Sequence, residues 1–109
     1  MFYLNEIVNI NKKFANGNII NKSSLEFALS SIKDKGWIDQ VAYLVRALLI
    51  DHVFEDGNKR TAAGIIIAYY TEFEIGFDPQ KITEVIIKII SKNINNINKI
   101  KRMIKDVVR

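Results

Sequence analysis

Apolar residues recur every three or four positions along most of this chain, and no convincing series of alternating polar and apolar positions indicates strands. Such spacing predicts helices with one buried face. The predicted helices are residues 2–14, a second that begins at 23 or 24 and stops at 36, then 37–49, 59–73, 79–90 and 97–107. We therefore expect an all-α fold, a compact bundle of about six helices formed as a single domain by residues 1–109.

Residues that favour turns and caps separate these helices. The Asn-Gly-Asn run at 16–18 breaks the chain after the first helix, because Gly and Asn tolerate positive φ. Ser23 or Ser24 is expected to cap the second helix, and Gly36 to end it. Pro79 fits the first turn of the fifth helix.

The helices predicted at 37–49 and 59–73 are apolar on nearly every face. Helices of this kind lie in the interior of a bundle, so we expect these two to form its buried centre. The segment between them interrupts the apolar pattern and is predicted to be a loop.

Charge and composition exclude several classes of protein. The net charge is +4, and residues 92–109 hold six basic residues and one acid, so the rest of the chain is nearly neutral. A near-neutral body with a basic tail argues against a protein that coats nucleic acid. The chain has no cysteine, which excludes disulfides and thiolate metal sites and suits a reducing cytosol.

The longest apolar stretches, residues 41–50 and 62–70, are too short to span a bilayer. Residues 1–6 lack the basic start and apolar run of a signal peptide. We therefore expect a cytoplasmic protein without a membrane partner.

The candidate chemistry is concentrated at residues 52–62, which read His-Val-Phe-Glu-Asp-Gly-Asn-Lys-Arg-Thr-Ala. The only histidine of the chain, His52, is able to accept a hydroxyl proton near neutral pH. Asp56 is a suitable ligand for Mg²⁺, and Lys59 and Arg60 are suited to phosphate oxygens. The start of a helix adds free N–H groups that favour an anion. Together these residues indicate phosphate chemistry.

Each of these residues taken singly also has a plainer interpretation. A histidine at a helix end is often a C-terminal cap, and Asp56 is able to cap the fourth helix. Gly57-Asn58 alone predicts only a turn, and Lys59 and Arg60 on a bare helix are usually solvated.

The spacing of the motif resembles the signature of the Fic/Doc family, His-x-Phe-x-Asp/Glu-x-Asn-Gly/Lys-Arg. The form with lysine before the last arginine is the one of the death-on-curing (Doc) branch. Six positions agree, namely His52, Phe54, Asp56, Asn58, Lys59 and Arg60. The resemblance implies that His52 is the general base, that Asp56 binds Mg²⁺ and that Arg60 neutralises charge on the transferring phosphates. It further implies a phosphate cradle at Gly57, Asn58 and Lys59, while Phe54 is expected in the core.

The segment after the first helix extends the resemblance. Gly17, Asn18, Ile19 and Ile20 resemble the flap with which the family binds its target protein, and the Ile pair is expected to be extended. Strand addition is one way for such a flap to hold a target. An ordinary helix–helix loop is the alternative.

Lysine at position 59 determines which reaction the resemblance implies. Family members with glycine there typically transfer the nucleoside monophosphate of ATP, whereas the Doc branch transfers the terminal phosphoryl group. The resemblance thus implies a kinase that uses Mg²⁺ and ATP to phosphorylate a Ser or Thr hydroxyl of a target, for which a translation elongation factor is a candidate. An adenylyltransferase that tolerates Lys59, and an inert binding module with the same fold, remain open.

Three positions depart from or refine this picture. Gly57 lies where the Doc branch often has alanine, and Ala63 lacks the second arginine of many adenylylating members. Asp51 precedes His52, and its carboxylate either raises the pKa of the imidazole or lies on the far face of the helix.

No Ser/Thr-x-x-x-Glu-Gly/Asn segment, the inhibitory helix of many Fic enzymes, occurs in the sequence. The resemblance therefore implies a toxin of a toxin–antitoxin system, silenced in trans by a separate antitoxin protein. The basic tail is a candidate docking face for an acidic partner, and a solvated helix face is the alternative.

Overall fold

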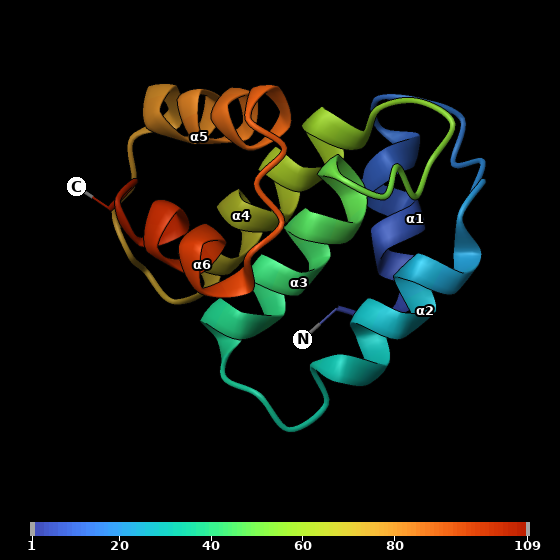
Figure 1. The fold of residues 1–109 in the computed structure, drawn as a ribbon, viewed down its shortest axis with the longest axis horizontal. Helices are drawn as coiled ribbons and strands as arrows, with labels where there is room; N and C mark the ends of the chain where they lie inside the picture. The colour runs from blue at the N-terminus through green and yellow to red at the C-terminus, as the bar shows by residue number, and fades with distance from the viewer. Residues whose placement is uncertain (1, 109) are drawn as a thin grey trace.

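The computed structural model describes residues 2–108, within which six α-helices form the regular secondary structure (Figure 1). They are α1 (Leu4–Lys12), α2 (Lys22–Ser31), α3 (Trp37–Leu49), α4 (Asn58–Glu72), α5 (Pro79–Ser91) and α6 (Ile97–Lys105). Extended pairing in this part of the chain is limited to two isolated antiparallel bridges, Ile19 with Phe54 and Phe77 with Val108. The predicted all-α class and the number of helices are confirmed.

Helices α3 and α4 lie side by side at the centre, with α1 and α2 on one side and α5 and α6 on the other (Figure 1). Apolar side chains of both central helices are almost fully buried. The larger buried aliphatic residues of α3 and α4 are Val41, Leu44, Val45, Leu48, Leu49, Ile65 and Ile66. The prediction that the helices around the motif form the buried centre is confirmed, and their burial fixes both ends of the loop between them.

The second helix begins differently from the prediction. Asn21, not Ser23 or Ser24, is the N-cap of α2, and its side-chain oxygen accepts a hydrogen bond from the Ser24 N–H at 3.3 Å. Asn is among the strongest capping residues, and its side-chain nitrogen also donates to the Asp51 carbonyl at 3.0 Å. This second bond ties the start of α2 to the end of α3, which no local sequence signal shows.

The end of the second helix was also wrongly predicted. α2 ends at Ser31, and Gly36 is the N-cap of α3. The hydroxyls of Ser30 and Ser31 both donate to the Phe27 carbonyl, at 2.9 and 2.8 Å. Side-chain bonds of this kind compete with the backbone bonds that extend a helix, which accounts for the early end. Pro79 lies in the first turn of α5, as predicted.

An aromatic cluster surrounds the C-terminal end of α4, which is the end farther from the motif. Tyr69 and Tyr70 are buried, and their hydroxyls donate to Gln40 Oε1 and to the Ile104 carbonyl, both at 2.6 Å. Burial raises the pKa of Tyr69 and of Tyr70 to about 12. Both rings therefore belong to the core. Among the helices described, none has the length and apolar character needed to cross a membrane.

Candidate functional site

The motif loop, residues 50–57, connects the two central helices. Val53 and Phe54 are fully buried inside it, so the prediction that Phe54 belongs to the core is confirmed. The Asn58 side chain closes the loop with two hydrogen bonds to Phe54: its oxygen accepts from the Phe54 N–H at 3.0 Å, and its nitrogen donates to the Phe54 carbonyl at 2.8 Å. The Asn58 side chain thus fixes the loop, and only its backbone is free to face a phosphate.

The first turn of α4 presents free backbone donors. The N–H groups of Asn58, Lys59 and Arg60 have no hydrogen-bond partner among residues 2–108. Such unpaired groups at the start of a helix carry partial positive charge and favour an anion. Of the three residues predicted to cradle phosphates, Asn58 and Lys59 have free N–H groups, whereas the Gly57 N–H donates to Asp56 Oδ1 at 2.8 Å.

Gly57 is the N-cap of α4 and adopts a left-handed conformation, with φ of 79°. A Cβ atom at this position would lie 3.0 Å from both the Ala15 Cβ and the Asn11 Nδ2. The positive φ and the close approach of α1 and of the segment after it favour glycine at this position.

We expect Gly57→Ala to lower the free energy of unfolding by about 1–2 kcal/mol, because an L side chain is strained at positive φ, and further through the crowded contacts with Ala15 and Asn11. Urea denaturation followed by circular dichroism measures the change. Gly36→Ala is the matched control, since φ at Gly36 is −64° and a Cβ there meets nothing within 4 Å. Equal stabilities of the two variants would contradict this account of Gly57.

Two polar residues, Asn11 and Thr61, form hydrogen bonds to the loop, and neither has any exposed surface. Asn11 Nδ2 donates to the Asp56 carbonyl at 2.9 Å and to Thr61 Oγ1 at 3.1 Å, while Asn11 Oδ1 accepts from the Gly17 N–H at 2.9 Å. Thr61 Oγ1 donates to the Gly57 carbonyl at 2.8 Å. Neither residue was predicted to belong to the site. The available signal was that Asn11 follows Ile7 by four positions and so lies on the buried stripe of its helix.

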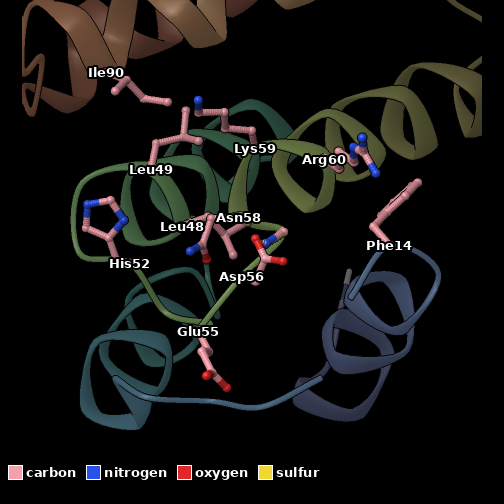
Figure 2. A pocket seen from close by; sticks show the side chains of 11 residues that line it. Phe14, Leu48, Leu49, His52, Glu55, Asp56, Asn58, Lys59, Arg60 and Ile90 are labelled. Carbon is pink, nitrogen blue, oxygen red and sulfur yellow. Dashed lines mark hydrogen bonds between the residues drawn. The ribbon is translucent and has the colours of Figure 1, made fainter. Parts of the chain in front are cut away.

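The predicted flap pairs with the motif loop. Ile19 forms an antiparallel bridge with Phe54, the Ile20 N–H donates to the Val53 carbonyl at 2.8 Å, and the Glu55 N–H donates to the Asn18 carbonyl at 2.9 Å. The extended conformation predicted for the Ile pair is therefore present at Ile19. Glu55 points toward the flap and accepts from Asn18 Nδ2 at 2.8 Å (Figure 2).

Asp51 is directed away from the candidate base. Its carboxylate accepts a hydrogen bond from the Ser24 hydroxyl at 2.6 Å, which places it against α2. His52 has a left-handed backbone, with φ of 52°, and its exposed imidazole has no hydrogen bond to any residue between 2 and 108. Of the two alternatives for Asp51, the structure favours the carboxylate on the far face. The imidazole nitrogens remain free for a substrate.

The motif residues share one cavity of about 410 Å³ (Figure 2). Its lining comprises Phe14, Leu48, Leu49, His52, Glu55, Asp56, Gly57, Asn58, Lys59, Arg60 and Ile90. All the residues predicted for catalysis, phosphate binding and the metal are thereby brought together. The four flap residues lie outside this lining. Phe14, Leu48, Leu49 and Ile90 are apolar lining residues that the motif did not reveal.

The cavity has a defined arrangement of charge (Figure 2). His52 lies on one side near Leu49, Asp56 near the middle, and Arg60 on the other side next to Phe14. The Asp56 Oδ1 accepts from the Gly57 N–H at 2.8 Å, which leaves Oδ2 without a partner among the residues described. The described residues contain no group of three or more His, Cys, Asp or Glu able to hold a metal ion. A single carboxylate nevertheless suits Mg²⁺, which commonly combines one or two protein oxygens with phosphate and water.

Comparisons with protein-family models, with curated proteins and with solved structures gave no match to this chain. The resemblance to the Fic/Doc family rests on the motif residues and the flap segment.

Proposed function

We propose that this protein is a Doc-like toxin that transfers the terminal phosphoryl group of ATP to a Ser or Thr hydroxyl of a target protein. One observation carries the proposal: a single cavity joins a free histidine, a carboxylate and the start of a helix that bears two cations. This is the set of groups that phosphoryl transfer requires, because positioning and neutralisation of charge supply most of its rate.

His52 is the proposed general base. In the reaction, the target hydroxyl oxygen bonds to the terminal phosphorus of ATP, the bond from that phosphorus to the bridging oxygen of ADP breaks, and the hydroxyl proton passes to the imidazole. Its free nitrogens and its place on the cavity wall suit this role. A strained backbone at a candidate catalytic residue supports it further, because the surrounding structure must hold such a conformation.

Asp56 is the proposed ligand of Mg²⁺, which would neutralise charge on the phosphates when bound. The bond from the Gly57 N–H fixes one carboxylate oxygen, and the other is left for the metal. The hydrogen bond from Asn11 Nδ2 to the Asp56 carbonyl holds the backbone of the same residue. The carboxylate is thus held in place before any ligand arrives.

The phosphates are proposed to lie over the first turn of α4. The free N–H groups of residues 58–60 would bind their oxygens, and Lys59 and Arg60 would neutralise their charge. Arg60 is the proposed stabiliser of the charge that develops during transfer. The same cavity also serves transfer of a nucleoside monophosphate in principle. Lys59 favours the kinase because its side chain occupies the space that glycine leaves open in adenylylating members.

The flap is proposed to bind the target protein. Ile19 pairs with Phe54 through its flanking residues, so its own N–H and carbonyl are unpaired among residues 2–108. Ile20 beside it is 61% exposed. An unpaired strand edge with an exposed apolar side chain suits an extended target segment, and a translation elongation factor is the candidate target.

An antitoxin that acts in trans completes the proposal. Most basic residues of the tail lie on α6 (Ile97–Lys105), where Lys101 already forms an ion pair of 2.8 Å with Asp39. The remaining cations of this helix are the proposed docking face for an acidic partner.

Expression of the chain in a bacterial host without an antitoxin tests the proposal as a whole. We expect growth arrest with the native chain and normal growth with His52→Ala at an equal protein level, because the toxicity depends on the general base. Quantitative immunoblotting confirms the protein level. Normal growth with the native chain, or arrest that persists with His52→Ala, would contradict the proposed toxin.

A further inference from the structure

Asn11 makes the most extensive set of buried polar contacts outside the motif. Its side chain has no exposed surface, and both of its N–H donors are used, one by the Asp56 carbonyl and one by the Thr61 hydroxyl. Its oxygen accepts from the Gly17 N–H. One amide on α1 therefore holds the candidate metal ligand, the start of α4 and the first residue of the flap.

The chemistry of these contacts requires an amide. Aspartate would keep an acceptor for Gly17 but would direct an oxygen at the Asp56 carbonyl, and leucine would fill the space without any partner for the three groups.

Two of the Asn11 partners connect it to the candidate site: the Asp56 carbonyl directly, and the Thr61 hydroxyl, which in turn donates to the Gly57 carbonyl. Asp56 carries the free carboxylate oxygen, and Gly57 begins the turn that presents the N–H groups of α4. The Asn11 Nδ2 also lies close to position 57: a Cβ atom placed on Gly57 would be 3.0 Å from it. Asn11 is thus close to Asp56 and Gly57, the two loop residues that directly precede the free N–H groups of α4.

We infer that Asn11 is a positioning residue, which fixes the Asp56–Gly57 loop for binding of Mg²⁺ and nucleotide and holds it in register with the flap at Gly17. This role rests on the proposed function, since it concerns the binding of Mg²⁺ and ATP at the same cavity. Asn11 touches neither ligand in this account and acts only through the backbone of the loop.

The test compares Asn11→Leu with Tyr70→Phe. The Tyr70 change also removes one buried hydrogen bond, to the Ile104 carbonyl, but far from the cavity. Calorimetric titration with Mg²⁺ and a non-hydrolysable ATP analogue gives the affinity at a temperature where circular dichroism shows both variants folded. We expect binding to Asn11→Leu to be about tenfold weaker than to the native chain, as for other residues that orient metal ligands. Binding to Tyr70→Phe should be unchanged.

Amide hydrogen exchange without nucleotide gives an independent result. We expect faster exchange at Gly17 and Gly57 in Asn11→Leu, relative to the loss of global stability, and no such excess in Tyr70→Phe. Asn11→Asp should retain the protection of Gly17, whose acceptor it keeps, and lose that of Gly57.

The outcomes separate this inference from the proposed function. Native affinity in Asn11→Leu, or exchange at Gly57 that matches the Tyr70→Phe control, would overturn the positioning role. Absence of nucleotide binding by the native chain would overturn the proposed function, and hydrogen exchange would still decide whether Asn11 fixes the loop.

Discussion

Replacement of His52 by alanine is expected to lower the rate of phosphoryl transfer by about 10²–10⁴-fold, the usual contribution of a general base. The imidazole lines the cavity and has no hydrogen-bond partner among the residues described, so its removal deletes a proton acceptor without breaking a structural contact. Single-turnover transfer from labelled ATP to the target measures the rate. The affinity for nucleotide should change little, because α4, not His52, is the proposed binding site of the phosphates.

His52→Asn is the matched variant for this prediction. Asparagine tolerates the left-handed backbone found at this position and cannot act as a base. Both variants should therefore show the same loss of rate, and His52→Asn should also retain the native melting temperature. Full activity in either variant would exclude His52 as the general base.

Replacement of Lys59 by glycine is expected to change the group that is transferred. The lysine side chain lines the cavity and extends from the first turn of α4 toward Leu49 and Ile90 (Figure 2). Glycine would open this space to a phosphate close to the backbone and would remove one positive charge. We expect the variant to lose transfer of the terminal phosphoryl group and to gain transfer of the nucleoside monophosphate.

Lys59→Arg provides the control, since it keeps both bulk and charge and should remain a kinase. Glycine inside the first turn also lowers helix stability by about 1 kcal/mol relative to alanine, so a melting curve must accompany the assay. If Lys59→Gly transfers the same group as the native chain, the lysine does not select the reaction.

The sequence was most informative where local signals agree with the tertiary structure. The apolar faces of α3 and α4 predicted the centre of the bundle because burial on all sides requires such composition. The short spacing of the motif placed its residues in one loop and in the first turn of α4, and this proximity brings His52, Asp56 and Arg60 to one cavity. Pro79 predicted the first turn of α5 because its fixed φ suits that position.

The features that the sequence did not reveal depend on contacts between distant segments. Asn21 prevailed over Ser23 and Ser24 as the cap because it also bonds the end of α3, 30 positions away. Asn11 contacts Asp56, which is 45 positions away, and only the folded chain shows that its partners belong to the motif loop. Phe14, which follows α1, and Ile90, which lies on α5, likewise reach the cavity from distant parts of the sequence.

The central claim, transfer of the terminal phosphoryl group from ATP by the 52–60 motif, is tested most directly with label. The purified chain is incubated with Mg²⁺ and a bacterial lysate, with ATP labelled at the terminal phosphate in one sample and at the α-phosphate in another. We predict protein-bound label from the terminal position only, and none with His52→Ala. Label from the α position only would make the protein an adenylyltransferase, and an absence of label from both positions would contradict the proposed kinase and favour an inert binding module.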